Sequence, residues 1–213
     1  TFTGSAATGR MLKANPRIIA ETVPFNLEAD SLNASVLGED AKPGTPDFDI
    51  FVKSVQSEMT VKAGQKCTAI RRAMVPEHLL PSVQEAVIAR LQKTVIGDPQ
   101  AEGVRMGALA THVQIGRVEA EMNKLMAEQE LVFNPDLDLV GATDAGAFYT
   151  PKLFVNSDPF TNTKVHEVEP FGPVSTLMPY KTIDEAVQLT AMGRGSLVTS
   201  FVSKNTSDIV AFT

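Results

Sequence analysis

The sequence predicts an α/β fold in which helices pack against a layer of β-strands. Short apolar runs of strand length alternate along the chain with amphipathic stretches of helical length, a pattern typical of layered α/β domains. The composition is that of a globular chain, since 43% of the 213 residues are hydrophobic and 21% are charged. A chain of this length can bury a substantial core, so we expect one domain, or one domain with appendages.

The elements expected in the first half of the chain follow from apolar spacing and from proline and glycine signals. Pro16 is expected to stop the first helix, whereas Pro76 is expected near the start of a later one. Apolar residues recur at a helical period between residues 47 and 62. In order, we expect a helix at 5–15, strands at 23–27 and 32–37, a loop at 38–46, a helix at 47–62, a strand at 70–75 and a helix at 76–93.

The second half of the chain continues the alternation. Gly97-Asp98-Pro99 predicts a turn, and residues 134–147 predict a polar loop with one or two short strands around it. The remaining elements are expected to be a helix at 112–128, strands at 153–155 and 174–178, a helix at 183–192, a strand at 196–202 and a last helix that runs to the end of the chain.

Charge and motif content disfavour several classes of function. The formal net charge of −6 and the pI of about 5.1 disfavour nucleic-acid or anionic-membrane binding as the main activity. No uninterrupted apolar stretch is long enough to span a bilayer, and the N-terminal residues lack the charged region and apolar core typical of a signal peptide, so we expect neither feature in these residues. His78, His112 and His166 are scattered, so we expect no metal site. A single cysteine indicates a reducing compartment, most simply the cytoplasm.

Cys67, the only cysteine, is a candidate nucleophile. It lies in the run Lys62-Ala63-Gly64-Gln65-Lys66-Cys67-Thr68, and Arg71 follows shortly after. Nearby positive charge lowers the pKa of a thiol and raises the fraction of thiolate, which is the form that attacks carbon. Free cysteines often simply pack in a core, and composition alone favours that interpretation.

A glycine turn, Gly4-Ser5-Ala6-Ala7-Thr8-Gly9, precedes the first expected helix. A helix N-terminus offers backbone N–H groups and a positive dipole end to an anion, and a serine there adds a hydroxyl donor. A dinucleotide phosphate would fit such a turn. Gly-Ser before a helix is also an ordinary N-cap, and the turn alone favours the cap.

Glu28 is a candidate general base. It lies between strand-like segments in Phe25-Asn26-Leu27-Glu28-Ala29-Asp30-Ser31. Partial desolvation there would raise the pKa of its carboxyl toward the range useful for a base. A solvated acid in a turn is the alternative, and taken alone it is favoured.

The run Glu169-Pro170-Phe171-Gly172-Pro173-Val174 predicts a rigid loop before a strand, because its prolines and glycine disfavour regular structure. Such loops are good places to hold side chains that contact a ligand. A tight turn without a ligand is the alternative.

Taken together, these segments resemble the aldehyde dehydrogenase superfamily, in its order and with roughly its spacing. Residues 2–9 are similar to the phosphate-binding turn of that family, and Glu28 to the glutamate that heads its Glu-Leu-Gly-Gly-Lys motif. Gly64-Gln65-Lys66-Cys67 is similar to its Gly-Gln-x-Cys motif, and residues 169–174 to its Glu-Ile-Phe-Gly-Pro-Val motif. The resemblance covers essentially the whole chain and implies a three-layer αβα open sheet, the fold of that family's catalytic domain.

Departures from the general family pattern indicate which branch of the superfamily the sequence resembles most. Ala29-Asp30-Ser31-Leu32-Asn33 follows Glu28 in place of Leu-Gly-Gly-Lys, and the interval to Cys67 is longer than usual. With residues 62–72, this run resembles the dehydrogenase part of bifunctional phenylacetate-degradation proteins, which also carry an enoyl-CoA hydratase domain. A close relative is the semialdehyde dehydrogenase of the aerobic benzoyl-CoA pathway. The implied substrate is a CoA-linked semialdehyde, and the implied oxidant is NADP, with NAD as the alternative.

The resemblance also implies a role for each candidate residue. The Cys67 thiolate attacks the aldehyde carbon, hydride leaves to the nicotinamide, and water activated by Glu28 hydrolyses the resulting thioester. The implied cofactor-binding residues are Gly4, Ser5 and Gly9 at the pyrophosphate, Glu169 at the nicotinamide ribose and Phe171 near the nicotinamide.

The domain organisation is expected from the same resemblance. Residues 1–27 correspond to the last piece of a dinucleotide-binding domain with the crossover, and residues 28–213 to a catalytic domain. Both ends are expected to be cuts relative to a larger parent, because no methionine opens the chain and no cap closes its last helix. The parent is expected to be a homo-oligomer with a fused hydratase domain, and the 213-residue chain alone to be inactive.

Two alternatives stay open at this point. The chain can belong to a non-catalytic scaffold of dehydrogenase ancestry, in which case Cys67 should be alkylated slowly. It can also belong to a CoA-acylating aldehyde dehydrogenase, in which free CoA replaces water as the group that resolves the thioester. That class does not need a base at Glu28, so the presence of Glu28 favours hydrolysis.

Overall fold

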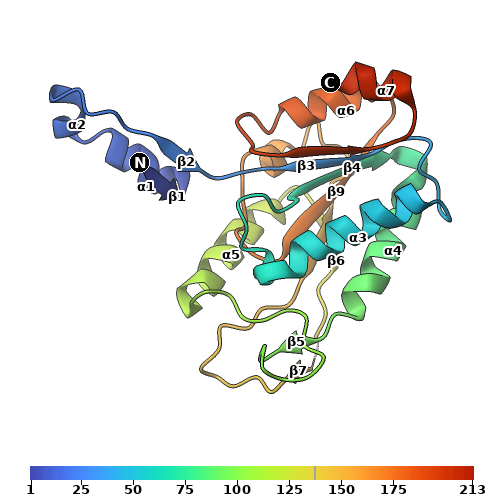
Figure 1. Ribbon diagram of the computed structural model, residues 1–213, viewed down its shortest axis with the longest axis horizontal. Coiled ribbons are helices and arrows are strands. Elements are labelled where there is room, and N and C mark those ends of the chain that lie inside the picture. Colours follow the sequence, from blue (N-terminus) through green and yellow to red (C-terminus); the bar gives the residue numbers. More distant parts are fainter. Residues whose placement is uncertain (137) are drawn as a thin grey trace. The chain divides into compact units, whose positions relative to one another are not determined.

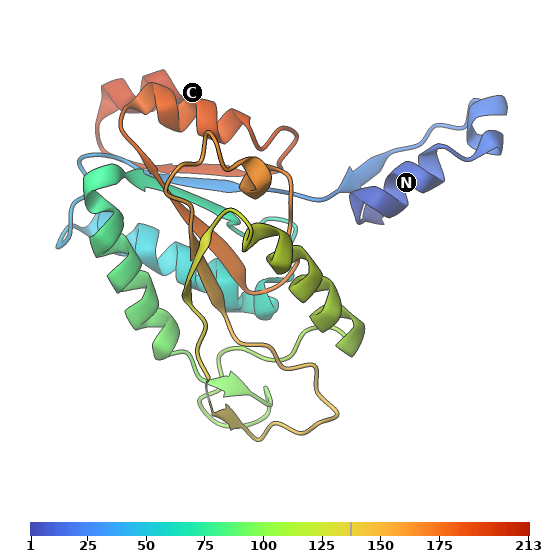
Figure 2. The same ribbon diagram turned by 180° about the vertical axis from the view of Figure 1, so that it is seen from behind.

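In a computed structural model, the chain forms two compact units, Thr1–Ser31 and Leu32–Thr213, which Figures 1 and 2 show from opposite sides. The structure describes residues 1–136 and 138–213. Glu28 belongs to the first unit and Cys67 to the second. The assignment of a cofactor-domain piece and a catalytic domain stays a prediction.

The first unit is a small β–α–α–β segment. Its two strands pair in parallel, with Thr3 opposite Glu28, and the two helices make the connection that a parallel pair requires. The elements are β1 (Phe2–Gly4), α1 (Ala6–Lys13), α2 (Pro16–Ala20) and β2 (Leu27–Ala29).

One expectation for this unit is met and another is wrong in detail. The first helix ends before Pro16, as expected, but Pro16 also opens a second helix, α2, that was not expected, and there the Asn15 side chain accepts a hydrogen bond from Arg17 N at 3.0 Å. Proline suits a first helical turn, whose N–H has no intrahelical partner. The strand expected at 23–27 is absent over residues 23–26 and begins only at Leu27.

The second unit is built on a six-stranded sheet with the order β10-β3-β4-β9-β8-β6. Neighbouring strands are parallel, except that β6 and β8 are antiparallel. The strands are β3 (Ala34–Leu37), β4 (Arg72–Pro76), β6 (Glu130–Phe133), β8 (Lys152–Val155), β9 (Val174–Tyr180) and β10 (Thr199–Val202). A separate parallel pair joins β5 (Ile96–Gly97) and β7 (Leu139–Val140).

Helices cover both faces of this sheet, as Figure 1 shows. Because side chains alternate along a strand, Ala73 and Val75 of β4 face a cluster with residues of α3 (Pro46–Thr60) and α4 (Leu80–Gln92), whereas Met74 faces a cluster with residues of α6 (Ile183–Ala191). The predicted three-layer αβα arrangement is therefore confirmed. The helices are α3 (Pro46–Thr60), α4 (Leu80–Gln92), α5 (His112–Leu125), α6 (Ile183–Ala191) and α7 (Thr206–Phe212), with short 3₁₀ turns at Val61–Gly64, Glu77–Leu79 and Thr163–His166.

A buried cation joins the sheet to α6. The Arg72 side chain, 1% exposed, donates to the carbonyl oxygens of Leu32, Leu189 and Thr190 at 2.7, 2.6 and 3.0 Å. Its Nη1 also lies 3.0 Å from Nδ1 of His166, which accepts because a guanidinium only donates. Burial lowers the pKa of Arg72 to about 10, so the side chain stays protonated at neutral pH.

The described residues form neither a bilayer-spanning helix nor a metal-binding group of acidic, histidine and cysteine side chains. No helix within residues 1–136 and 138–213 has both the length and the hydropathy to cross a bilayer. In the same part of the chain, no group of three or more histidine, cysteine, aspartate or glutamate side chains is placed to hold a metal ion.

Candidate functional site

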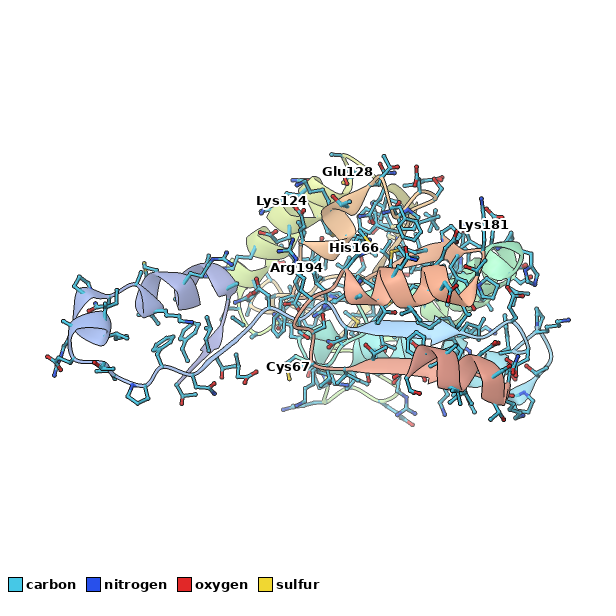
Figure 3. The ribbon with its side chains drawn as sticks, turned by 90° about the horizontal axis from the view of Figure 1, so that it is seen from above. Cys67, Lys124, Glu128, His166, Lys181 and Arg194 are labelled. Carbon is cyan, nitrogen blue, oxygen red and sulfur yellow. The ribbon has the colours of Figure 1, made fainter. Side chains whose placement is uncertain are left out.

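The two candidate segments of the second unit meet at one edge of the main sheet. The Cys67 loop (residues 61–71) leads into β4, and the Glu169 loop (residues 169–173) leads into β9. These strands are adjacent and parallel, so the loops before them emerge at the same, amino-terminal edge. Ligands of open α/β sheets more often bind beyond the carboxyl ends of the strands. Cys67 itself is exposed, and Figure 3 shows it at the surface.

The Cys67 loop begins with a run of left-handed backbone. Lys62, Ala63 and Gly64 have φ values of 53°, 51° and 67°. Left-handed backbone is sterically unfavourable for Lys62 and Ala63, because each has a Cβ atom. At Gly64 the absence of a side chain is essential, because an added Cβ would lie 2.2 Å from the carbonyl oxygen of Gly172. The backbones of the two loops are therefore in direct contact here.

Gln65 reinforces the contact between the two loops. Its Nε2 donates to the carbonyl oxygen of Phe171 at 3.2 Å, and its Oε1 accepts from Ala110 N at 2.8 Å. Both ends of the amide are thus engaged, which fixes the side chain. The glutamine of the Gly-Gln-x-Cys motif therefore holds the Cys67 loop against the Glu169 loop.

The cations expected around Cys67 are largely engaged by carboxylates. Lys66 Nζ lies 2.7 and 2.8 Å from the two carboxylate oxygens of Glu58. Arg71 Nε lies 3.3 Å from Oε1 of Glu169, and these two side chains are only 2% and 6% exposed. Two of the cations in the sequence argument for an activated thiol therefore have their own anionic partners.

Asn33, which sequence reasoning missed, anchors the segment that carries Cys67. The buried Asn33 side chain donates through Nδ2 to the carbonyl oxygens of Cys67 and Ala69 at 2.9 and 3.0 Å. Its Oδ1 accepts from Val198 N at 2.9 Å. The signal in the sequence was an amide inside an apolar strand, where a buried polar group needs partners.

Ser5 is the N-cap of α1, the alternative that the turn alone favoured. Its Oγ accepts from Thr8 N at 3.3 Å and donates to Thr8 Oγ1 at 3.0 Å. The carboxylate of Asp30 also accepts from Ala6 N at 3.0 Å. One N–H group of the helix N-terminus is therefore already bound to an acid of the same unit.

The two glycines of this turn have different surroundings. Gly4 ends β1, where it pairs with Ala29. Gly9 is buried, and an added Cβ would lie 2.2 Å from Cδ1 of Leu27. A glycine here allows α1 to lie close to β2, which is the use that dinucleotide-binding segments make of a glycine in this part of the motif.

Glu28 lies on β2, opposite Thr3. The side chain is exposed, as the favoured alternative of a solvated acid has it, although the residue lies on a strand and not in a turn. Its role as a base stays a prediction. The structure therefore brings together Cys67, Glu169 and Phe171 through their loops in the second unit, and Gly4, Ser5, Gly9 and Glu28 within the first.

Comparison with known proteins decides the family. The sequence model described as "Aldehyde dehydrogenase family" matches residues 1–213. The chain belongs to the aldehyde dehydrogenase family. It is 43% identical over 206 residues to "3,4-dehydroadipyl-CoA semialdehyde dehydrogenase" of Aromatoleum evansii, which covers 95% of this chain and 40% of the relative.

Solved aldehyde dehydrogenase structures share the fold. A betaine aldehyde dehydrogenase of Staphylococcus aureus in complex with NAD⁺ superimposes with a TM-score of 0.84 at 26% identity, over 99% of this chain and 40% of that one. An NAD-dependent aldehyde dehydrogenase of Sinorhizobium meliloti gives 0.81 at 26% identity, with the same coverage of 99% and 40%. The chain therefore spans about 40% of the length of these relatives.

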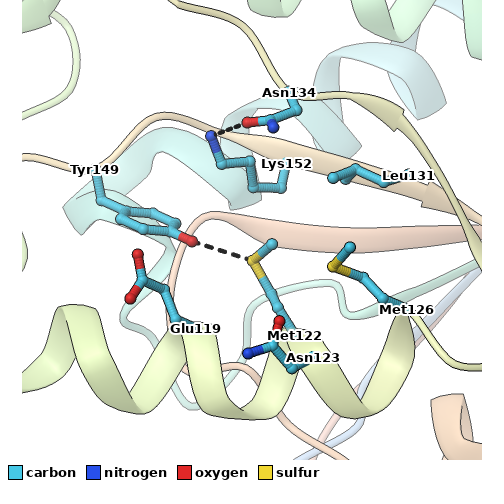
Figure 4. Close-up of a pocket in the computed structure, with 8 residues that line it drawn as sticks. All are labelled: Glu119, Met122, Asn123, Met126, Leu131, Asn134, Tyr149 and Lys152. Carbon is cyan, nitrogen blue, oxygen red and sulfur yellow. Dashed lines mark hydrogen bonds between the residues drawn. The ribbon is translucent and has the colours of Figure 1, made fainter.

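The described residues of the second unit line cavities that include the following two. A cavity of about 350 Å³ (Figure 4) is lined by Glu119, Met122, Asn123, Met126, Leu131, Asn134, Tyr149 and Lys152, none of them a predicted site residue. Burial and the charge of Glu119 raise the pKa of Tyr149 there to about 12. A second cavity, about 270 Å³, is lined by residues that include Thr68, the neighbour of Cys67, and Glu58.

Replacing Gly64 by alanine is expected to destabilise the full-length dehydrogenase and to separate the two loops. Left-handed backbone costs an alanine about 1–2 kcal/mol, and the clash with Gly172 adds about 1–3 kcal/mol for overpacking. Chemical unfolding followed by circular dichroism measures the total.

Gly44→Ala is the matched control for this substitution. Gly44 also has a positive φ, 89°, but an added Cβ would meet no atom within 4 Å. It should therefore show the backbone cost alone. Equal losses of stability in the two variants would contradict a tight contact between the Cys67 loop and the Glu169 loop.

Proposed function

We propose that the protein containing this chain oxidises a CoA-linked semialdehyde to the carboxylic acid, with Cys67 as nucleophile and a nicotinamide dinucleotide as oxidant. The observation that carries the proposal is an exposed thiol on a loop clamped to the Glu169 loop, in a member of the aldehyde dehydrogenase family. The substrate class is supported by the 43% identity to a relative named for a CoA-linked semialdehyde.

Each unit contains proposed cofactor-binding residues of its own. Glu169 offers a carboxylate acceptor for ribose hydroxyls, and Phe171, 38% exposed, offers an apolar ring close to the Cys67 loop. Gly4, Ser5 and Gly9 are the residues that would hold the pyrophosphate at α1, where Asp30 accepts from Ala6 N and Ser5 Oγ from Thr8 N. When bound, the dinucleotide supplies an acceptor for hydride.

The remaining chemistry belongs to residues of this chain. The Cys67 thiolate forms a bond to the aldehyde carbon, which gives a thiohemiacetal. Loss of hydride from that carbon leaves a thioester on Cys67. Glu28 takes a proton from water as the water attacks the thioester, the carbon–sulfur bond breaks, and the acid leaves.

The wider setting is part of the same proposal. The resemblance supports NADP as the oxidant, whereas the structure of the S. aureus relative contains NAD⁺, so NAD is the alternative. We place the reaction in aerobic phenylacetate degradation, with the benzoyl-CoA pathway as the alternative. The whole protein is proposed to be a cytoplasmic homo-oligomer with a fused enoyl-CoA hydratase domain.

Alkylation of Cys67 in the full-length protein tests this proposal. Iodoacetamide near neutral pH should modify Cys67 faster in the folded protein than in the urea-unfolded protein, and aldehyde or cofactor should slow the reaction. Peptide mass mapping follows the cysteine individually. Slow alkylation that neither ligand changes would favour a non-catalytic scaffold.

A further inference from the structure

We infer that Arg71 is a positioning residue that couples the Cys67 loop to the Glu169 loop and holds the Glu169 carboxylate in place for cofactor binding. This inference rests on the proposed function, in which Glu169 meets the nicotinamide ribose. It concerns a residue that contacts neither the aldehyde nor the cofactor in that proposal and acts through others.

The guanidinium of Arg71 reaches both loops at once. Its Nη2 donates to the carbonyl oxygen of Gly64 at 2.8 Å, on the Cys67 loop. Its Nη1 donates to the carbonyl oxygen of Gly172 at 2.6 Å, and its Nε to Oε1 of Glu169 at 3.3 Å, both on the Glu169 loop. Each of the three nitrogens thus has a different partner, an arrangement that a lysine ammonium on a flexible stem cannot reproduce.

The backbone of Arg71 is fixed where the side chain begins. Its N–H donates to the carbonyl oxygen of Asn33 at 3.1 Å, and its carbonyl oxygen accepts from Thr176 N at 3.0 Å. Arg71 is therefore bonded to the residue that precedes β3 and to a residue of β9, the strands on either side of β4. These backbone hydrogen bonds fix the position of the Cα atom of Arg71 in the sheet. The side chain therefore connects the sheet to the two loops in a defined geometry.

Burial makes the pair with Glu169 sensitive to the loss of either partner. The Arg71 and Glu169 side chains are 2% and 6% exposed. Burial lowers the pKa of Arg71, and the charge of Glu169 opposes this effect. A buried carboxylate without its cation would protonate or turn toward water, and a protonated or displaced Glu169 would be a poorer acceptor for ribose hydroxyls.

The same guanidinium also lies near the ring of Phe171. The carbon Cζ of Arg71 is 5.6 Å from the ring centroid, within the range of a cation–π contact. Arg71 therefore contacts both residues of the Glu169 loop that the proposed function assigns to the cofactor.

The next residue, Arg72, is also a buried arginine, but its side chain has different partners from that of Arg71. The Arg72 side chain binds the carbonyl oxygens of Leu32, Leu189 and Thr190 and the ring of His166. None of these residues belongs to the two site loops. The two adjacent arginines thus point to opposite faces of the sheet, one toward α6 and the other toward the candidate site.

A double-mutant cycle in the full-length enzyme tests the inference through the KM for the nicotinamide cofactor. Arg71→Lys keeps a positive charge and most of the buried stem, and should raise this KM about tenfold, as loss of charge-assisted hydrogen bonds implies. Glu169→Gln should raise it at least as much. The double variant should be no worse than Glu169→Gln alone, because Arg71 acts through that carboxylate.

The outcomes separate the inference from the proposed function. If Glu169→Gln raises the cofactor KM but Arg71→Lys does not, or if the two effects multiply, Arg71 is only structural and the inference is overturned. If Glu169→Gln leaves the cofactor KM unchanged, the role of Glu169 in the proposed function fails instead, and the inference fails with it.

A second readout covers the case in which Arg71→Lys is too unstable for kinetics. Cofactor should slow the alkylation of Cys67 by iodoacetamide in the wild-type protein, because the two loops are joined. In Arg71→Gln, which keeps amide donors but no charge, saturating cofactor should slow alkylation at least about threefold less. Unchanged protection in a folded Arg71→Gln protein would overturn the coupling.

Discussion

Replacing Cys67 by alanine is expected to lower the kcat of aldehyde oxidation by about 10⁴-fold or more, the scale seen when a covalent nucleophile is removed. Without the thiol no thiohemiacetal forms, and an aldehyde bound without that bond is a poor hydride donor. The measurement is the appearance of reduced nicotinamide in both the burst and the steady state, with the full-length protein.

Cofactor binding is the control for this variant. The Cys67 side chain is exposed, and the contact that anchors this residue to Asn33 uses its backbone carbonyl oxygen. Cys67→Ala should therefore keep the fold and bind the dinucleotide with an unchanged Kd. A folded variant that oxidises the aldehyde at a rate within about tenfold of wild type would remove Cys67 from the mechanism.

Replacing Glu28 by glutamine is expected to separate the two halves of the reaction. Hydride transfer does not need the base, so a burst of about one reduced cofactor per site should remain. Hydrolysis of the thioester does need it, so steady-state turnover should fall by about 10²–10⁴-fold, the usual contribution of a general base. Rapid-mixing measurements of cofactor absorbance resolve the two phases.

Glu21→Gln is the matched control for Glu28→Gln. Glu21 is another exposed acid of the first unit, where it pairs with Arg17 on the surface at 3.1 Å. Exposed pairs of this kind contribute little to stability, so this variant should retain both the burst and the turnover. Normal turnover in Glu28→Gln itself would exclude Glu28 as the base.

Local signals in the sequence predicted most of the fold. The helical spacing of Phe48, Phe51 and Val55 corresponds to the buried face of α3. Apolar residues at this spacing lie on one side of a helix, and that side packs against the core. Pro16 was ambiguous, since a proline can both end one helix and open the next. The strand at residues 23–27 was misplaced because the position of β2 depends on its pairing with β1, a long-range contact.

Only part of the candidate site could be predicted from the sequence. Cys67 and Glu169 stood out because their flanking glycines and prolines form recognisable motifs. The connections made by Gln65, Asn33 and Arg71 did not, because they depend on β4 and β9 being neighbours in the sheet. For the same reason, Arg71 was counted as a cation near the thiol, whereas its partner is the Glu169 carboxylate.

The most direct test of the central claim is the mass of the peptide that carries Cys67. Glu28→Gln protein is mixed with a CoA-linked semialdehyde and the dinucleotide, quenched with acid after the burst, and digested. We predict that Cys67 carries the acyl group of the substrate as a thioester, in an amount equal to the reduced cofactor formed. A completed burst with Cys67 unmodified would contradict the assignment of Cys67 as the nucleophile.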